Sequence, residues 1–593
     1  MKVLMTGNEA IARGAYEGGV NFAAAYPGTP STEIIENLSK YKDEVQVEWA
    51  VNEKVAMDTA IGASIAGGRS LAAMKMVGVN VAADPLFTYA YMGVNGGFVF
   101  VSADDPGMYS SQNEQDNRYY AEFAKIAMLE PSSSQECKDM ARAAFEISEK
   151  YNTPVMIRTT TRVNHGKSMV ELGDRVEAEL KPYDRKMGLA RFDAIPAVSR
   201  RLRVELEDRL SKLREFSETC EFNFVEWNTD EIGIITSGVA YVYAKEVFGN
   251  KASYLKLGFT HPLPMNKIRD FAGKVKTLYV IEELEPYLER HLREAGIECI
   301  GKEKLPSIGE LLPEIIAEKL LGRKNETIEF NREKLVPRPP TLCAGCPHRG
   351  FFYEIGKIKN IMIASDIGCY SLGGSAPLYA KDTCVCMGAS AGTGHGAQRI
   401  FDLKGEGTRV VAVMGDSTFF HTGLNGVLNA IYNKSNLITC VLDNRTTAMT
   451  GHQDHPGTGF TASGDVTQEV SIEDVVRAFG CNNVRTINPH HLNEVRDAIK
   501  WALELDEPSV IVARYPCAVK KYTEADLKEF GPLTQKCYVD EEKCIGCKRC
   551  TKTGCPAIHF KPAKKKSSIN EAMCVGCTVC AQVCPVKAIM VKE

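Results

Sequence analysis

The sequence predicts a multidomain α/β protein that ends in a small cysteine-rich module. Its 593 residues exceed what one hydrophobic core usually organises, so about four domains are expected. Short apolar runs alternate with helix-like segments through most of the chain, which is typical of parallel sheets covered by helices. Eight of the 20 cysteines lie between Cys544 and Cys584, a clustering that favours metal ligation over disulfides.

The composition excludes several kinds of protein. Apolar residues make up 44%, charged residues 25%, and the formal charge is −4, so no general nucleic-acid-binding surface is expected. No run approaches the ~18 apolar residues of a membrane helix. The charge of Glu9 interrupts the N-terminus before a signal-peptide core could form. We therefore expect a cytoplasmic protein that neither enters a membrane nor binds nucleic acid.

The first α/β region is expected over residues 1–165. Six apolar runs there read as buried strands that lead into loops: VLMTG, FAAAYPGTP, VQVEW, SLAAMKMVG, FVFVSADD and PVMIRTTT. Residues 166–230 are expected to form a helical linker, because four leucines between Leu202 and Leu213 recur at helical spacing among charged residues. Such a stripe is typical of an amphipathic helix.

Two more α/β regions and a terminal module complete the expected domain order. The second region is expected over 231–325 and the third over 341–520, separated by a polar, proline-rich linker at 326–340. The cysteine-rich module covers 537–593.

The cysteines of the module form two similar sets. In each set three cysteines are separated by two residues, and a fourth precedes a proline. Three thiolates at this spacing can wrap one [4Fe–4S] cluster while the fourth ligand crosses to the other cluster. We assign Cys544, Cys547, Cys550 and Cys584 to one cluster, and Cys574, Cys577, Cys580 and Cys555 to the other. The alternative is two zinc sites, which normally use cysteine pairs separated by a longer loop.

This module resembles a bacterial two-cluster ferredoxin, which implies that it carries single electrons. Its first set has one residue more before the fourth cysteine than the usual ferredoxin run. The module holds ten Lys and Arg against five Asp and Glu. Two oxidised clusters with four thiolates each would add about −4, so the basic excess roughly neutralises them.

A second candidate site follows two apolar runs of the third region. VVAVM and LITCVL are followed within two residues by Asp416 and Asn444. Parallel strands place their carboxyl ends on one edge of the sheet, where ligands bind. The oxygens of Asp416 and Asn444 can therefore converge on one Mg²⁺, with the backbone carbonyl of Thr446 as a third ligand. Ser417 and Thr418 can offer N–H and hydroxyl donors to a diphosphate.

This spacing resembles the thiamine diphosphate motif, in which Gly-Asp-Gly is followed roughly thirty residues later by Asn. Here Ser417 replaces the last glycine. Gly388, Ala389 and Ser390 are expected to back the cofactor, together with the glycine-rich segment GTGHGA at 392–397. That segment lacks the GxGxxG spacing of a dinucleotide site.

Thiamine chemistry also needs a carboxylic acid at the aminopyrimidine ring. Glu53 follows the candidate strand VQVEW and begins an alanine-rich helix, where partial burial would raise its pKa toward a useful range. The alternative is a surface glutamate that is stabilised by the helix macrodipole.

These three features on one chain resemble the 2-oxoacid:ferredoxin oxidoreductases over nearly the full length. Tyr26-Pro27-Gly28-Thr29-Pro30-Ser31 is similar to the family's YPxTPS loop, whose threonine faces the substrate carboxylate, which points to Thr29. The order of domains is similar to that of the large subunit in the indolepyruvate group: pyrimidine-binding, transketolase-C-like, diphosphate-binding, ferredoxin. The segment CAGCPHRG at 343–350 is also characteristic of that group.

The resemblance implies the reaction and its partners. Aryl pyruvates such as indolepyruvate and phenylpyruvate would be decarboxylated oxidatively, coenzyme A would take the acyl group, and external ferredoxin would take the electrons. The family's gamma-type domain has no counterpart on this chain. A separate small beta subunit is therefore implied, in a heterodimer or heterotetramer.

A third cluster is a further hypothesis. In several relatives a CxxC pair, a Gly-Cys turn and a late Pro-Cys hold a [4Fe–4S] cluster beside thiamine. Cys343, Cys346, Cys369 and Cys517 follow that layout. The alternative is ordinary buried thiols.

Three alternative functions share part of these features. A thiamine-dependent decarboxylase without redox chemistry would use Asp416, Asn444 and Glu53 but not the eight ferredoxin cysteines. A non-catalytic electron-transfer subunit, or an oxidoreductase for other 2-oxo acids, are the remaining alternatives. His421, His452 and His455 could shuttle protons but are expected to be structural. Arg118 either binds a carboxylate or pairs with Asp116.

Overall fold

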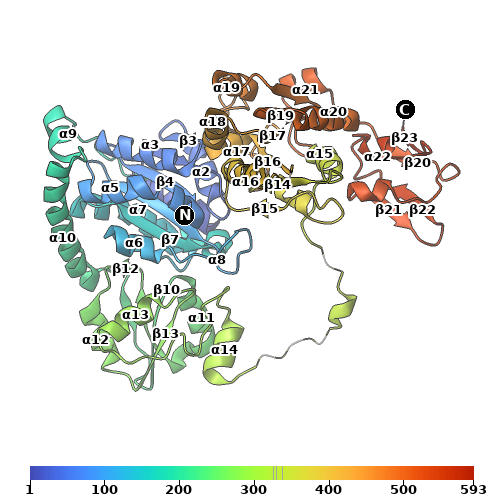
Figure 1. The fold of residues 1–593 in the computed structure, drawn as a ribbon. Coiled ribbons are helices and arrows are strands. Elements are labelled where there is room, and N and C mark those ends of the chain that lie inside the picture. The colour runs from blue at the N-terminus through green and yellow to red at the C-terminus, as the bar shows by residue number, and fades with distance from the viewer. Residues whose placement is uncertain (325, 327, 329, 337, 406, 593) are drawn as a thin grey trace. The chain divides into compact units, whose positions relative to one another are not determined.

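The computed structural model describes residues 1–324, 326, 328, 330–336, 338–405 and 407–592, and it divides into two compact units. The first unit is Met1–Phe330 and the second is Asn331–Glu593 (Figure 1). Residues 327, 329 and 337 of the expected linker lie outside the described residues. Within the described part of the chain no helix is long and apolar enough to cross a membrane.

The first unit is built on a seven-stranded sheet in the order β12-β6-β7-β5-β4-β2-β3. All neighbours run parallel except β12 with β6. Its strands are β2 (Phe22–Ala25), β3 (Gln46–Trp49), β4 (Ser70–Lys75), β5 (Phe98–Asp104), β6 (Ala127–Leu129), β7 (Val155–Thr160) and β12 (Phe259–His261).

Helices cover both faces of this sheet, because its strands are apolar on both sides. In β4, Leu71 and Ala73 belong to one apolar cluster, while Ala72 and Met74 belong to the other. The first face carries α1 (Gly7–Glu17), α2 (Thr32–Leu38) and α7 (Ser134–Tyr151), and the second carries α3 (Glu53–Ile65), α5 (Ala83–Met92) and α6 (Arg118–Ala124). This is the burial on two sides that parallel sheets require.

The first expected strand lies elsewhere. VLMTG falls in β1 (Lys2–Thr6), which pairs antiparallel with β8 (Lys167–Glu171) outside the parallel sheet. None of the residues of β1 is fully buried. An antiparallel pair of strands can pack one face on the core and leave the other face exposed to solvent. The expectation of a helical linker over 166–230 is wrong at both ends, because β8 and β9 (Phe224–Glu226) are strands.

The amphipathic helix is confirmed as α10 (Pro196–Thr219). Leu202, Leu206, Leu210 and Leu213 are all buried. Arg209 on the same helix donates to the backbone carbonyls of Ala90, Tyr91 and Asn152, which fixes α10 against the end of α5.

The second α/β region shares a core with the first. Its own sheet has the order β13-β10-β11-β9 and is covered by α11 (Gly238–Phe248), α12 (Met265–Ala272), α13 (Tyr287–Glu294) and α14 (Pro313–Leu321). Strands β10 (Ile232–Ser237), β11 (Ser253–Leu257) and β13 (Thr277–Ile281) are parallel. Strand β12, which lies between β11 and β13 in the chain, joins the seven-stranded sheet, and this explains why residues 1–330 form one unit.

The second unit contains a fully parallel six-stranded sheet in the order β15-β14-β16-β17-β19-β18. Its strands are β14 (Ile361–Ser365), β15 (Thr383–Cys384), β16 (Arg409–Gly415), β17 (Ile438–Asp443), β18 (Val484–Ile487) and β19 (Ser509–Arg514). The helices are α15 (His348–Ile355), α16 (Ser390–Lys404), α17 (Asp416–Thr418), α18 (Leu424–Tyr432), α19 (Ile472–Ala478), α20 (Leu492–Leu503) and α21 (Glu524–Phe530).

The cysteine-rich module follows in the same unit. Two short antiparallel pairs frame it: β20 (Cys537–Val539) with β23 (Ile589–Val591), and β21 (Ile558–Lys561) with β22 (Lys566–Ile569). Gln582, in α22 (Val579–Gln582), hydrogen-bonds the backbone of His490 and Leu492, which attaches the module to α20.

We predict that the buried stripe of α10 is an important source of stability in the first unit. Leu213→Ala should lower the free energy of unfolding by about 3 kcal/mol, because it leaves a cavity in the core. Val204 on the same helix is 63% exposed, and Val204→Ala should have little effect. Urea titration followed by hydrogen exchange in residues 196–219 measures both variants, and equal effects would contradict the assignment of the buried face.

Candidate functional site

Polar and sulfur-bearing residues gather at the carboxyl edge of the six-stranded sheet. Asp366 follows β14, Asp416 follows β16, and Asn444 follows β17. The chain after β19 is joined to the same edge, because the N–H of Cys517 donates to the carbonyl of Asn444 at 2.9 Å. Ligands of parallel sheets bind at this edge.

Oxygens of Asn444 and Thr446 converge on the carboxylate of Asp416. The side-chain oxygen of Asn444 lies 3.2 and 3.3 Å from the carboxylate oxygens of Asp416 and 2.8 Å from the carbonyl oxygen of Thr446. Acceptors facing one another in this way repel, unless the amide turns over or a cation lies among them. Adjacent oxygens around an octahedral Mg²⁺ stand about 3 Å apart, so this donor set fits that ion.

The surroundings keep Asp416 ionised. Burial favours the neutral acid, but the His455 ring and the N–H of Ser417 hold the pKa of Asp416 below its ordinary value. The His455 Nε2 lies 3.1 Å from the Asp416 carboxylate, and its Nδ1 accepts from Gly457 N–H at 3.1 Å. The Nε2 therefore carries the proton, and His455 orients the carboxylate.

The pKa of the neighbouring carboxylate, Asp443, is shifted in the opposite direction. Burial and the nearby Asp416 raise the pKa of Asp443 to about 6, and Arg514 opposes the shift from 2.6 Å. Arg514 therefore balances part of the negative charge at the strand ends.

Ser417 and Thr418 lie at the start of a continuous helical segment. The segment runs from α17 through a π-helical turn at Phe419–Gly423 into α18. The Ser417 hydroxyl accepts from Thr447, and the Thr418 hydroxyl pairs with that of Tyr370 at 2.7 Å. Backbone N–H groups at a helix start favour an anionic ligand.

Gly388, Ala389 and Ser390 form the start of α16. Gly388 has φ +82°, and a side chain there would come within 1.9 Å of the Thr422 hydroxyl, so only glycine fits. Ser390 donates through both its N–H and its hydroxyl to Asp366, at 2.9 and 2.6 Å. Asp366 was not predicted, although it also follows an apolar strand. The GTGHGA segment lies inside α16 and is not a loop.

The four cysteines proposed for a third cluster lie within electrostatic range of one another, but among the described residues no three of them are placed to share a single metal ion. Burial raises the pKa of Cys369 to about 12, and the thiolates of Cys517 and Cys343 add to the shift. The pKa of Cys346 is also raised by burial, with contributions from Cys369 and Cys517. Asp416 contributes to the shift at Cys369 as well, so the cysteines and the Asp416 site are neighbours.

In the terminal module Cys544, Cys547, Cys550 and Cys584 line one small cavity. Cys555, Cys577 and Cys580 lie within electrostatic range of one another. Cys574 accepts a hydrogen bond from the N–H of Cys537 at 3.3 Å. Among the described residues no three His, Cys, Asp or Glu are placed to share a single metal ion.

Two features near the second set were not predicted. Cys537 lies beside it, and hydrogen bonds from Cys580 and Cys574 lower the pKa of Cys537 to about 7. Arg349 is 2% exposed and donates to the carbonyls of Thr553 and Cys343 at 2.8 and 2.9 Å. Its charge opposes the raised pKa of both Cys346 and Cys577, so one buried guanidinium lies between two cysteine sets.

In the first unit, Glu53 is 7% exposed and is the first residue of α3, after the N-cap Asn52. A side chain on Gly78 would come within 2.6 Å of the Glu53 Cγ, so Gly78 leaves room for the carboxyl group. Lys75, at the end of β4, lies nearby. Burial lowers the pKa of Lys75 to about 8, and Asp105 and Glu53 oppose the shift.

Lys75 also reaches the Thr29 loop. Its Nζ donates to the carbonyl of Ser110 at 2.6 Å, and the Ser110 hydroxyl lies 3.4 Å from the Thr29 carbonyl oxygen. The backbone of Gly28 packs on the Lys75 side chain. Lys75 was not predicted, because in the sequence it is only a single charge inside the apolar run SLAAMKMVG.

Other predicted side chains have structural partners. Arg118 pairs with Asp116 at 2.5 Å and with Glu282 at 2.6 Å, and it is 1% exposed. His421 lies 3.0 Å from the Thr422 hydroxyl, and His452 lies 3.7 Å from the Cys517 sulfur.

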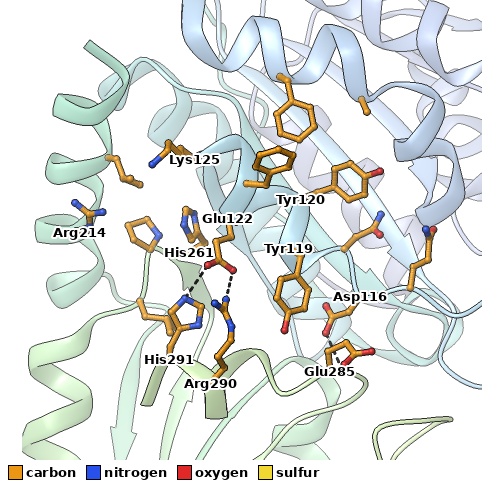
Figure 2. A pocket seen from close by; sticks show the side chains of 18 of the residues that line it. Asp116, Tyr119, Tyr120, Glu122, Lys125, Arg214, His261, Glu285, Arg290 and His291 are labelled. Atoms are coloured by element: carbon orange, nitrogen blue, oxygen red, sulfur yellow. Dashed lines mark hydrogen bonds and ion pairs between the residues drawn. The ribbon is translucent and has the colours of Figure 1, made fainter. Parts of the chain in front are cut away.

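A cavity of about 1060 Å³ in the first unit contains none of the predicted site residues (Figure 2). Phe87 and Phe123 form one side, with ring centroids 4.6 Å apart. Glu122 pairs with Arg290 at 2.5 Å and with His291 at 3.5 Å. The carboxylate of Glu122 is therefore already paired within the cavity wall.

Three family models match the chain. Residues 13–207 match the thiamine diphosphate-binding domain of pyruvate flavodoxin/ferredoxin oxidoreductases. Residues 366–513 match the C-terminal TPP-binding domain of thiamine pyrophosphate enzymes, and residues 537–591 match a 4Fe-4S dicluster domain.

Curated relatives match over nearly the whole length. The chain is 42% identical to indolepyruvate oxidoreductase subunit IorA of Archaeoglobus fulgidus, over 94% of this chain and 93% of that protein. It is 43% identical to the subunit of the same name from Pyrococcus horikoshii, over 99% and 96%. The subunit from Methanothermobacter marburgensis is 39% identical, over 94% and 92%.

Proposed function

This chain belongs to the family of indolepyruvate oxidoreductase IorA subunits, and from that premise we propose that it oxidatively decarboxylates aryl pyruvates to aryl-acetyl-CoA. Electrons would pass through [4Fe–4S] clusters to ferredoxin. The observation that carries the proposal is the set of convergent oxygens at Asp416, Asn444 and Thr446, in the same unit as the cysteine sets.

The cofactor end of the reaction would use the carboxyl edge of the six-stranded sheet. Asp416, Asn444 and the carbonyl of Thr446 would hold Mg²⁺, and the N–H groups of Ser417 and Thr418 would hold the diphosphate. Gly388, Ala389 and Ser390 would support the cofactor from α16. Bound thiamine diphosphate supplies the carbon nucleophile and the electron sink that decarboxylation needs.

The first unit would supply the proton-transfer and substrate groups. Glu53 would hold a proton at the aminopyrimidine nitrogen, a role that fits a buried carboxyl group at a helix start. The Thr29 hydroxyl and the Lys75 ammonium would bind the carboxylate of the 2-oxo acid. An ammonium in a partly dry site attracts a carboxylate more strongly than it would in water.

The cysteine sets would carry the electrons away from the cofactor. Cys343, Cys346, Cys369 and Cys517 would hold the first cluster, next to Asp416. Arg349 separates this set from Cys577, so the cluster of Cys574, Cys577, Cys580 and Cys555 would follow. The cluster of Cys544, Cys547, Cys550 and Cys584 would come last.

The complete enzyme would contain a second chain. A small beta subunit with the gamma-type domain, in a heterodimer or heterotetramer, would complete it. Coenzyme A would accept the acyl group, and the reaction would take place in the cytoplasm.

The test of this function is an anaerobic assay of the chain with its small subunit, using several 2-oxo acids and a viologen acceptor.

Asp416→Ala should abolish thiamine diphosphate binding and turnover but leave the iron content unchanged, because it removes a metal ligand. Glu53→Gln should keep the cofactor yet lose most turnover. Full activity of Asp416→Ala would refute the site, and equal rates for aliphatic and aryl substrates would refute the aryl preference.

The number of irons per chain shows whether the protein holds two or three [4Fe–4S] clusters. Anaerobically purified protein should contain about twelve irons per chain, three [4Fe–4S] clusters, and Cys369→Ser should lower the content toward eight. Cys440→Ser is the matched control, because Cys440 is a buried thiol in β17 that belongs to no set. About eight irons in the unchanged protein would remove the third cluster.

Loss of the Lys75 charge should weaken substrate binding at high pH. With a pKa of about 8, the ammonium is present at pH 7 and mostly lost at pH 9, so KM for phenylpyruvate should rise about tenfold between them. Lys75→Arg keeps its charge and should flatten the profile. If both proteins show the same rise in KM, Lys75 is not the titrating group.

A further inference from the structure

A groove of about 660 Å³ lies in the second unit, between the helices of the sheet domain and the cysteine-rich module. Side chains of α15 and α20 form one side. The turn at Cys550–Thr553 and the chain after α22 form the other. No sequence motif points to this groove, because its lining comes from five separated stretches of the chain.

The groove is strongly basic. Four cations line it, Lys357, Arg496, Arg549 and Lys552, against the single carboxylate of Glu354. Glu354 pairs with Lys357 at 2.8 Å and with Arg496 at 3.3 Å. Arg549 and Lys552 are exposed and make no ion pair within the part of the chain that the structure describes. The groove therefore keeps an excess of positive charge that faces solvent.

Cys584, a proposed cluster ligand, lies at both the groove and the interior cavity of the module. The half-buried Cys584 lines the groove, and it also lines the small cavity that Cys544, Cys547 and Cys550 share. A cluster held in that cavity would have one of its thiolates at the wall of the basic groove. Thiolate sulfur carries part of a cluster's electron density, so Cys584 is a short exit for an electron.

We propose that the groove is the docking site for an acidic one-electron carrier protein, which takes electrons from the cluster of Cys544, Cys547, Cys550 and Cys584. The proposal rests on the proposed function for the source of the electrons. In each encounter the reduced cluster loses one electron and the oxidised carrier gains one. No bond forms or breaks and no proton moves, and two carriers are reduced for each 2-oxo acid.

Charge complementarity identifies the occupant. Cations clustered around a redox centre attract an acidic partner, raise its association rate and orient it with its own centre toward the groove. A carrier needs this weak, fast contact because it must leave after each transfer. The small beta subunit is the competing occupant, and its loss from the complex is therefore one outcome of the test.

The experiment uses the assembled enzyme with Arg549→Glu and Lys552→Glu combined. With an acidic two-cluster ferredoxin as the probe, kcat/KM for ferredoxin should fall about tenfold or more, and its dependence on salt should weaken. Reduction of methyl viologen with the same 2-oxo acid should stay unchanged. Lys561→Glu is the matched control, because Lys561 is an exposed lysine of the same module that does not line the groove.

Ferredoxin kinetics, size-exclusion chromatography and calorimetry together decide whether the proposal holds. Unchanged ferredoxin kinetics in the double variant would overturn the proposal. So would loss of the beta subunit on size-exclusion chromatography, which would make the groove a subunit interface. Calorimetric titration with oxidised ferredoxin needs no turnover, and weaker binding of the double variant is expected there. If the unchanged enzyme binds ferredoxin but oxidises no 2-oxo acid, the proposed function fails while the docking site stands.

Discussion

The arrangement of the second unit depends on one constraint, the parallel register of its six-stranded sheet. Because every strand runs the same way, the residues that follow β14, β16, β17 and β19 all reach one edge. Two kinds of chemistry therefore meet there: the hard oxygens of Asp416 and Asn444, and the soft sulfurs of Cys369 and Cys517. A backbone hydrogen bond from the N–H of Cys517 to the carbonyl of Asn444 joins the two loops that carry these residues. Had one strand been antiparallel, its functional residue would lie at the opposite edge.

Much of this could be predicted from the sequence, because apolar runs determine the strands and the residue after each run must lie at an edge. The position of Asp416 and Asn444 at the carboxyl edge of the sheet was predicted in this way. The position of VLMTG was predicted wrongly, because an apolar run does not show whether one or both of its faces will be covered. Asp366 and Lys75 were missed for a different reason. Each is a lone polar residue whose meaning depends on neighbours that come from distant parts of the chain.

Buried charge in the first unit has a structural role that the sequence could not distinguish from a catalytic one. Arg118 and Arg158 lie among four buried carboxylates, which come from the first α/β region and from the strand end after β13. Burial raises the pKa of Asp104 to about 7, with Arg158 opposing the shift. Since an unpaired buried charge is costly, loss of either partner of such a pair would destabilise the packing of the two regions.

The basic residues of the second unit are divided between two positions that differ in solvent access. Arg349 is buried between two cysteine sets, where water cannot screen it and where its charge favours the reduced, more negative state of any cluster beside it. Arg549 and Lys552 face solvent beside Cys584, where salt screens them and their effect is on encounter. A buried cation stabilises the reduced state of a neighbouring cluster. Exposed cations instead attract the partner protein that accepts the electron. Arg549 and Lys552 of the terminal module would therefore do more than neutralise inorganic charge, because their exposed position lets them act on an approaching partner.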